Sequence, residues 1–424
     1  MSSDLPKTLE VRWHARRVGT LERADDASLR FTYEPAWLSS ADSFAICAAL
    51  PLAEGAHGPR ETRAFFANLL PDGALREELA RRHGVSVDND FALLANTGHE
   101  CAGALTIGPR TPGRASYRTL SLDELEALAT RDAGVSDIIQ ELAGEVRLSL
   151  AGAQSKLPVL ITAAGEIALP LGDTASTHIL KFESIRFKHL PANEVWMHGL
   201  ANAVGIDTAE IELKRFGASV ASLSQRYDRT RDEAGYVQRL HQQDFCQALA
   251  RLPTERYEAE GGPAVAECVR LVEHTSSDPL SDLDALLTRI LFNCAAGNAD
   301  AHGKNFALLH TPSSGWRLAP AYDLVCTKAF TGISEALAMR IGQHAQLDKI
   351  HHADICALAR DFGMGARLVT SRAVDLCDAV LDALPTTTTQ FQHRFGDSPA
   401  IERCMPTVRK QASGLRRRLA SSLT

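Results

Sequence analysis

The chain has 424 residues, of which 45% are hydrophobic and 23% are charged. This is the composition of a folded globular protein of two or three domains, and it excludes disordered, collagen-like and small disulfide-rich proteins. The net charge of -7 excludes a polyanion-binding surface over the whole molecule, although it is compatible with a local basic patch.

The first part of the chain predicts a small β-rich unit followed by helices. Residues 9–38 alternate β-branched or aromatic residues with polar ones around turn-like breaks, which is typical of short antiparallel strands. Residues 62–95 have the spacing of short amphipathic helices, interrupted at Pro71-Asp72-Gly73. A Gly- and Pro-rich stretch at 108–116 predicts the end of this unit, and we place the first domain at residues 1–115.

The rest of the chain predicts a β-rich lobe followed by a helical lobe. An acidic helix start lies at 121–129. Three strand-like runs follow at 147–162, 177–183 and 218–229, and a helical segment from Glu194 to Val204 separates the last two of them. Beyond residue 240 the periodicity is mainly helical. The sequence therefore predicts an α+β fold with a second domain at 116–228, a third at 229–424, and a cleft between them.

Nine cysteines are scattered without a CxxC pair or zinc-ligand spacing, which favours buried thiols over disulfides. The first residues lack the apolar region of a signal peptide, and no stretch reaches about 18 uninterrupted apolar residues. We therefore expect a cytoplasmic protein that does not contact a membrane.

The strongest chemical signal is NADAHGKNF at 298–306. Asp300 precedes Asn305 by five positions, and a second acid, Asp323, follows in LAPAYDLV. Phosphoryl transfer needs an acid beside the acceptor hydroxyl and oxygen ligands that hold magnesium on the triphosphate. Asp300 suits the first role, and Asn305 and Asp323 suit the second. The spacing alone is also compatible with ordinary turn residues, because Asp and Asn are common in loops.

Three upstream features have the order found in protein kinases. A loop of small residues at 149–156 offers backbone N–H groups to phosphates, Lys181 closes an apolar strand, and Glu194 begins a helix thirteen residues later. Each feature has an ordinary alternative. The loop alone is compatible with a β-turn, Lys181 with a solvated edge lysine, and Glu194 with a favourable helix-dipole interaction.

Longer motifs in the same order resemble the HipA-type serine/threonine kinases, the toxins of bacterial type II toxin–antitoxin systems. These motifs are FFANLLPDG, GHECAGAL, RLSLAGAQSK, STHILKF, NEVWM, QRYDR, HQQDFCQAL, YEAEGGP, NADAHGKNF and LAPAYDL. The resemblance implies a protein-kinase-like two-lobed fold with a small β-rich N-terminal subdomain and a mainly helical C-terminal lobe. It also implies ATP and Mg²⁺ in the cleft, phosphorylation of serine in a protein such as an aminoacyl-tRNA synthetase, and a HipB-type antitoxin that binds operator DNA.

Residue by residue, the resemblance implies that Asp300 is catalytic, that Asn305 and Asp323 bind magnesium, and that Ser149 is autophosphorylated. It implies nucleotide contacts by the phosphate loop, the strand lysine, the hinge and the catalytic region: Ala151, Gly152, Ala153, Gln154, Ser155, Lys156, Lys181, Gln225, Arg226, Tyr227, His302, Gly303, Lys304, Asn305, Tyr322 and Asp323. Two positions depart from the family pattern, which often has Glu at Gln225 and at Ser155. Hinge contacts use backbone groups and so tolerate Gln225, whereas Ser155 either alters the loop or offers a second phosphate acceptor.

Two other functions are compatible with some of these motifs. A small-molecule phosphotransferase of the antibiotic-kinase type uses the same acid and amide spacing, but 65–73 and 149–156 favour the HipA-type assignment. A non-catalytic corepressor is disfavoured because Lys181, Asp300 and their partners are retained. The basic run at 409–419 fits either a solvated helix face or a phosphate contact when an antitoxin places the chain on DNA.

Overall fold

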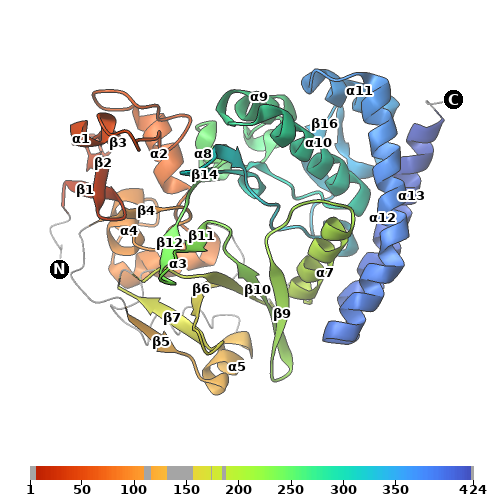
Figure 1. Cartoon of the computed structure of the whole chain (residues 1–424), viewed down its shortest axis with the longest axis horizontal. Coiled ribbons are helices and arrows are strands. Elements are labelled where there is room, and N and C mark those ends of the chain that lie inside the picture. Colours follow the sequence, from red (N-terminus) through yellow and green to blue (C-terminus); the bar gives the residue numbers. More distant parts are fainter. Residues whose placement is uncertain (1–5, 109–115, 131–155, 173, 184–187, 422–424) are drawn as a thin grey trace.

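The computed structural model describes residues 6–108, 116–130, 156–172, 174–183 and 188–421. It confirms the predicted α+β, protein-kinase-like fold, with a β-rich N-terminal subdomain, a sheet lobe and a mainly helical C-terminal lobe that follow one another across the molecule (Figure 1).

The N-terminal unit is built on a four-stranded antiparallel sheet of order β3-β2-β1-β4. In the first strand, Leu9 and Val11 alternate with polar residues and point into the core, as the sequence pattern predicts. The helices predicted at 62–95 are present, and the one after the Pro71-Asp72 break begins at Gly73. The elements are β1 (Thr8–Trp13), β2 (Arg16–Arg23), β3 (Leu29–Tyr33), α1 (Pro35–Leu38), α2 (Pro59–Ala67), α3 (Gly73–His83), α4 (Asp90–Thr97) and β4 (Leu105–Ile107).

The second lobe is a six-stranded antiparallel sheet of order β5-β7-β6-β8-β10-β9, followed by a small hairpin of β11 and β12. Its helix α7 begins at Leu190, four positions before the predicted start at Glu194, because Pro191 occupies the first turn, where its missing N–H costs nothing. The elements are β5 (Ser116–Thr119), α5 (Leu122–Thr130), β6 (Lys156–Ile161), β7 (Ile167–Leu171), β8 (His178–Phe182), α7 (Leu190–Ala203), β9 (Ile211–Phe216), β10 (Ser219–Gln225), β11 (Arg229–Arg231) and β12 (Val237–Arg239).

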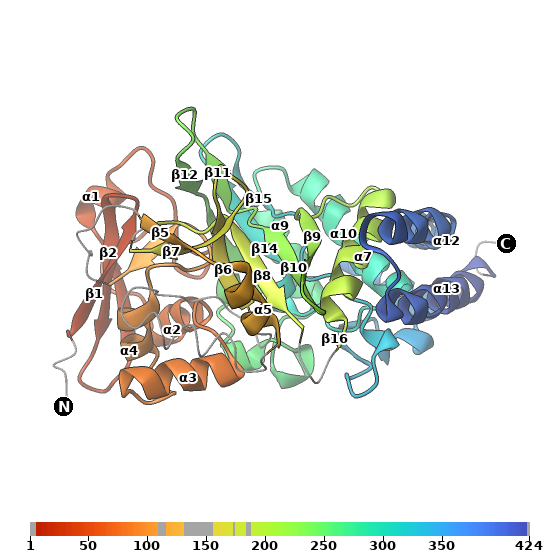
Figure 2. The same cartoon turned by 90° about the horizontal axis from the view of Figure 1, so that it is seen from below.

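The C-terminal lobe is mainly helical, and the long helices α12 and α13 pack side by side at the end of the molecule far from the N-terminal unit (Figure 2). Short strands and 3-10 turns carry its loops. The elements are β13 (His241–Asp244), α8 (Phe245–Ala248), η1 (Pro253–Glu255), η2 (Glu258–Glu260), α9 (Val265–Thr275), α10 (Pro279–Ala296), η3 (Gly303–Asn305), β14 (Ala307–Thr311), β15 (Gly315–Leu318), η4 (Thr327–Ala329), β16 (Ala336–Ile341), β17 (His344–Gln346), η5 (Leu347–Lys349), α11 (His352–Asp361), α12 (Ala366–Phe395) and α13 (Pro399–Ala420).

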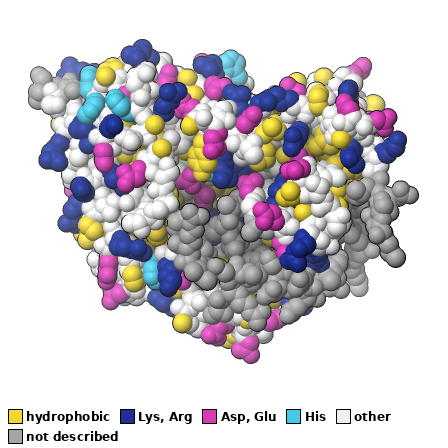
Figure 3. All heavy atoms as spheres, turned by 180° about the vertical axis from the view of Figure 1, so that it is seen from behind, with side chains coloured by type: hydrophobic (Ala, Val, Ile, Leu, Met, Phe, Trp, Pro, Cys, Tyr) yellow, Lys and Arg dark blue, Asp and Glu magenta, His cyan; other side chains and the backbone are white. Residues whose placement is uncertain are grey.

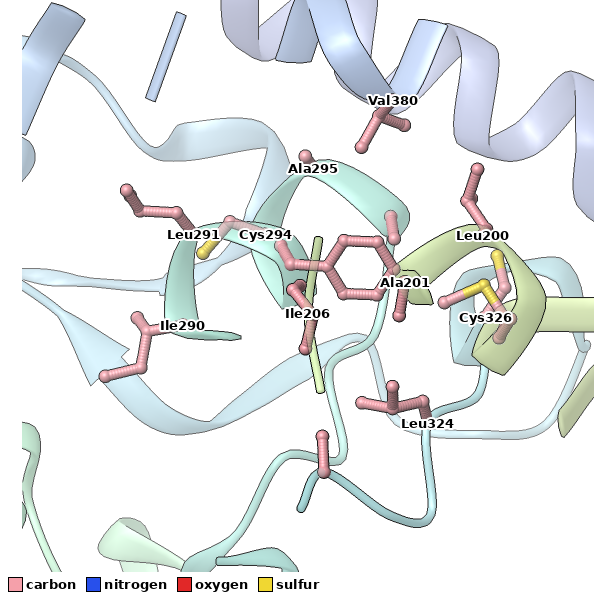
Figure 4. Close-up of a cluster of buried hydrophobic side chains, with 14 of the residues drawn as sticks. Leu200, Ala201, Ile206, Ile290, Leu291, Cys294, Ala295, Leu324, Cys326 and Val380 are labelled. Atoms are coloured by element: carbon pink, nitrogen blue, oxygen red, sulfur yellow. The ribbon is translucent and has the colours of Figure 1, made fainter. Parts of the chain in front are cut away.

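Two hydrophobic clusters hold these lobes together. One contains Val11 and Phe66 of the N-terminal unit together with Leu157 and Leu180 of the six-stranded sheet, so these two parts share a core. The other fills the C-terminal lobe between α7, α10 and α12, where Leu324 joins it (Figure 4). The domain boundary predicted near residue 115 therefore does not coincide with a separation of hydrophobic cores.

The cysteines follow the prediction of buried thiols. Eight of the nine cysteines are buried, and no disulfide joins them in the part of the chain that the structure describes. Within the same described residues, no helix is long and apolar enough to cross a membrane. Acidic and basic side chains are interspersed on the face shown in Figure 3, in keeping with the small net charge.

Candidate active site

Lys181 lies at the centre of a charge cluster formed by the sheet lobe and the C-terminal lobe, in which Lys181 and Glu194 are buried and Asp323 is partly exposed. Its Nζ is 2.5 Å from Oε1 of Glu194 on α7 and 2.7 Å from Oδ1 of Asp323. The other carboxylate oxygen of Glu194 accepts a hydrogen bond of 3.0 Å from Ser222. Because β8 lies between β6 and β10, Lys181 is on a central strand and is not a solvated edge lysine. Glu194 pairs with it directly.

The charges in this cluster stabilise one another. Burial opposes ionisation of Lys181, but the carboxylates of Asp323 and Glu194 outweigh it and raise the lysine pKa. Burial likewise opposes ionisation of Asp323, but Lys181 lowers its pKa well below the usual range. Asp323 also has a φ of 56°, in the left-handed region that side chains other than Gly, Asn and Asp rarely occupy. Such strained backbone is concentrated at functional sites.

Lys156 adds a second cation beside Lys181. The two lysines stand directly opposite each other in the pairing of β6 with β8. Burial lowers the pKa of Lys156 to about 8, and repulsion from Lys181 acts in the same direction. The carboxylate of Asp323 opposes these effects, but desolvation and repulsion prevail at Lys156, so the placement of the two cations suits a further anion such as a phosphate group. Of the predicted loop, Ala151–Ser155 and the modification site Ser149 lie outside the described residues.

Asp300 lies on the loop after α10, where Gly297 ends the helix with a φ of 77°. Its Oδ1 accepts a hydrogen bond of 2.9 Å from the hydroxyl of Tyr257, and its backbone N–H donates to Asn298 at 3.1 Å. Burial raises the pKa of Asp300 to about 6, against the lowering effect of the Tyr257 hydrogen bond. A carboxylate with a pKa near the working pH is suited to accept a proton.

The residues after Asp300 face in different directions. The side-chain amide of Asn305 donates a hydrogen bond of 2.8 Å to the backbone carbonyl of Asp300. The two residues at this five-residue spacing are therefore in direct contact. His302 is buried, its Nδ1 has no hydrogen-bond partner among the described residues, and burial lowers its pKa to about 3. Gly303 is needed because a Cβ there would lie 2.8 Å from Sγ of Cys246.

Lys304 points away from the charge cluster, toward the N-terminal unit. Its Nζ donates to the side chain of Asn68 at 2.6 Å and to Asp244 at 3.2 Å. Asn68 belongs to FFANLLPDG and Asp244 to HQQDFCQAL, so two motifs distant in sequence hold one lysine of residues 298–306, the candidate catalytic loop. In this structure the Lys304 ammonium is thus engaged in an interdomain contact, although the resemblance implies that it lines the nucleotide site.

The predicted hinge, Gln225 to Tyr227, joins the sheet lobe to the C-terminal lobe. The N–H groups of Gln225 and Arg226 already donate to Glu210 and Thr177, at 2.8 and 2.9 Å. The ring of Tyr227 lies 5.5 Å from that of Tyr322. The Tyr322 hydroxyl in turn donates 2.7 Å to the carbonyl of Lys304, which connects the hinge to the catalytic loop.

The side chain of Arg226 belongs to a buried ion network that joins the hinge to the N-terminal unit. We define this network as five side chains, each at most 8% exposed: Glu100, Arg226, Asp228, Arg229 and Arg239. Glu100 accepts hydrogen bonds from all three arginines, at 2.6 to 3.0 Å. Burial opposes ionisation of Glu100, but the three guanidinium groups lower its pKa to about 2. Glu100 is the acid of GHECAGAL.

The oxygen donors near Asp323 fit a magnesium ion shared with ATP phosphates. Among the described residues, no three His, Cys, Asp or Glu side chains gather to hold a metal by themselves. Magnesium in phosphoryl-transfer sites needs only one or two protein ligands, since phosphates and water supply the rest. The carboxylate of Asp323 and the amide of Asn305 line the same pocket, which provides such a pair of hard oxygen donors.

We predict that Lys181→Met weakens ATP binding about 10- to 100-fold, because it removes a charge-assisted contact to the phosphates. Calorimetric titration with ATP measures this, with the exposed Lys7→Met as control. The substitution should also lower the melting temperature, since it leaves the buried Glu194 without its cation, and adding Glu194→Gln should restore part of that loss. Unchanged ATP affinity would exclude Lys181 as the nucleotide lysine.

Several residues of the site were not predicted from the sequence to take part. Tyr257, Arg256 and Asp72 surround the catalytic loop, and Asn68 holds Lys304. Asn68 and Asp72 belong to FFANLLPDG and Tyr257 to YEAEGGP, whereas Arg256 lies outside the motifs. Nothing in the local sequence assigns these residues a role, because their partners lie 43 to 236 positions away in the chain. An invariant Tyr or Asn in a family alignment is the signal that would find them.

Models of two protein families match the chain. The HipA N-terminal domain matches residues 9–108, and the HipA-like C-terminal domain matches residues 148–387. Together these matches cover most of the chain; residues 109–147 lie between them, and the second match begins just before the proposed phosphate loop.

Individual proteins are similar over nearly the full length. The protein Y4mE of Sinorhizobium fredii, whose name describes it as a candidate kinase, is 37% identical over 97% of this chain and 99% of its own. The serine/threonine-protein kinase toxin HipA of Shewanella oneidensis is 30% identical over 91% of this chain and 90% of its own. A solved structure from the same organism, of HipA with HipB and operator DNA, superposes with a TM-score of 0.83 at 25% identity, covering 98% of this chain and 99% of the other.

Proposed function

Because this chain belongs to the family of HipA-type kinases, we propose that it transfers the γ-phosphate of ATP to serine or threonine residues of a protein. The observation that carries the proposal is the Lys181 cluster. A buried lysine bonded to a helix glutamate and to the acid after the catalytic loop is the arrangement that holds ATP in protein kinases.

The residues of the chain divide the chemistry between them. Asp300 accepts the proton of the target hydroxyl. At the same time, the oxygen of that hydroxyl forms a bond to the γ-phosphorus of ATP, and the bond between this phosphorus and the ADP oxygen breaks. Lys181 and Lys156 neutralise phosphate charge, with the loop Ala151–Ser155 as the proposed phosphate cradle. Magnesium, held by Asn305 and Asp323, would neutralise further charge on the phosphates.

We assign the adenine side of the site to the hinge at 225–227 and to Tyr322. The proposed domains remain 1–115, 116–228 and 229–424.

The proposed biological role is that of a toxin paired with a HipB-type antitoxin in the cytoplasm. The support is similarity to the Shewanella oneidensis HipA, whose structure was solved with HipB and operator DNA. Contact with DNA would then be made mainly through the antitoxin. We propose a translation protein, such as an aminoacyl-tRNA synthetase, as the target because the family resemblance implies one.

Labelled ATP tests this function. The chain is incubated with radiolabelled ATP and magnesium, in one arm with a bacterial protein extract and in the other with a panel of aminoglycosides and related antibiotics. Label in one or a few extract proteins, on serine or threonine, supports the protein kinase. Label in an antibiotic indicates the small-molecule phosphotransferase, and no transfer in either arm indicates a non-catalytic corepressor.

We predict that the active chain phosphorylates itself at Ser149 and that this modification abolishes its kinase activity. Ser149 lies outside the described residues, shortly before Lys156. A phosphoserine carries about -1.5 to -2 charges and would compete with ATP phosphates for the loop N–H groups and for the lysines.

Mass spectrometry after incubation with ATP and magnesium should find phosphate at Ser149. Ser149→Asp should be inactive, and Ser149→Ala should keep its activity for longer than the wild type. A fully active Ser149→Asp variant, together with a wild type that carries no phosphate at this position, would contradict self-inactivation.

A further inference from the structure

The segment 255–262, within YEAEGGP and just before it, lies over the catalytic loop. Its carbonyl at Arg256 accepts a hydrogen bond of 3.4 Å from the N–H of Gly303, and the ring of Tyr257 lies edge-on to His302 with centroids 5.3 Å apart. The segment closes on itself through the N–H of Gly262, which donates 2.8 Å to the carbonyl of Tyr257. A Cβ at Gly262 would lie 2.6 Å from the carbonyl oxygen of Glu255, which explains the glycine there.

The same segment is tied to both sides of the site. Asp72 of the N-terminal unit lies 3.3 Å from the guanidinium of Arg256, which stacks over the ring of Tyr257 at 5.1 Å. On the other side, Glu258 accepts hydrogen bonds from the backbone and side chain of Arg340 on β16, at 2.6 and 2.8 Å. Tyr257 is therefore held at a fixed place relative to Asp300 by contacts from two different elements.

The Tyr257 hydroxyl selects one oxygen of Asp300. It donates to Oδ1 at 2.9 Å, while Oδ2 receives no hydrogen bond from the described residues. A carboxylate on a loop rotates about its side-chain torsions, and a fixed donor on one oxygen restricts this rotation and leaves the other oxygen for the acceptor hydroxyl. Orientation of a reacting group contributes directly to rate.

We propose that Tyr257 is a positioning residue for Asp300, and that Asp72 supports it from the N-terminal unit through Arg256. The inference rests on the proposed kinase function and adds a role for the N-terminal unit in catalysis. Tyr257 does not contact ATP or magnesium in this account, so its loss should slow phosphoryl transfer and leave nucleotide binding unchanged.

Tyr257→Phe in the full chain tests the proposal, with the exposed Tyr236→Phe as a matched control. Transfer from labelled ATP to extract protein gives kcat and the KM for ATP. We expect kcat to fall about 10- to 100-fold, the effect of losing one hydrogen bond to a charged group, with the KM for ATP and the melting temperature unchanged. An unchanged kcat would overturn the positioning role, and so would an equal fall in the Tyr236→Phe control.

A double-variant cycle separates positioning from a general structural effect. If Tyr257 acts through Asp300, then adding Tyr257→Phe to Asp300→Asn should cause no further loss, whereas independent effects would multiply. Asp72→Asn should lower kcat less, about two- to fivefold, as expected for a partly exposed ion pair. An unchanged kcat in Asp72→Asn would overturn the supporting role of the N-terminal unit. A wild type without any transfer activity would overturn the kinase function itself, which distinguishes the two failures.

Discussion

Asp300→Asn is expected to lower the rate of phosphoryl transfer about 10²- to 10⁴-fold and to leave the fold intact, since the amide keeps the shape of the carboxylate but cannot accept the proton. The KM for ATP should change little, because Lys181 and the cluster around it are untouched. Growth inhibition on expression should disappear with the activity. Transfer from labelled ATP measures the rate, and the exposed Asp25→Asn serves as the control.

Stability should not fall in this variant. Burial raises the pKa of Asp300 to about 6, so the ionised carboxylate is disfavoured in the folded chain at pH 8. Asparagine removes that charge, and the melting temperature measured at pH 8 without ATP or magnesium should equal or exceed that of the wild type. Near wild-type transfer by Asp300→Asn would show that another group accepts the proton.

Glu100→Gln is expected to destabilise the chain by about 3–5 kcal/mol, because it removes one charge from a buried network and leaves three guanidinium groups facing a neutral amide. The exposed Glu54→Gln should change stability by less than about 0.5 kcal/mol. Urea denaturation followed by circular dichroism measures both.

The pH dependence of this loss has a definite sign. The three arginines lower the pKa of Glu100 to about 2 in the folded chain, from an ordinary value of 4.5. Its contribution is therefore fully present above pH 4.5 and is lost as the pH falls toward 2. The difference in the free energy of unfolding between wild type and Glu100→Gln should therefore shrink as the pH falls from 4.5 toward 2. A difference below about 1 kcal/mol at pH 7 would mean that the arginines are satisfied without Glu100.

Local sequence patterns predicted the elements but not the contacts between distant segments. Alternation in the first strands and the helix break at Pro71-Asp72-Gly73 depend on neighbouring residues, and both are found in the structure. Helix α7 begins four positions before the predicted start, because Pro191 fits the first turn of a helix.

In the site, the family motifs supplied the order of the candidate residues, and the structure supplies their pairing. The sequence could not decide whether Glu194 forms an ion pair with Lys181 or only interacts favourably with the dipole of its own helix. Both interactions need a glutamate at this position, and the structure shows the ion pair. The partners of Lys304 and Arg226 could not be predicted, since they lie on the N-terminal unit and their distance depends on the packing of whole lobes.

The contact between Lys304 and Asn68 has a consequence for how such chains diverge. Lys304 is only 8% exposed, and its ammonium donates a hydrogen bond to Asn68 of the N-terminal unit. If a different N-terminal unit packed here without an acceptor at this place, the buried charge would lose this hydrogen bond. Recombination that exchanges the first hundred or so residues between two relatives must therefore deliver acceptors for Lys304 at the same place. The N-terminal unit and the catalytic loop should be inherited together, so that a change in one restricts which changes the other can accept.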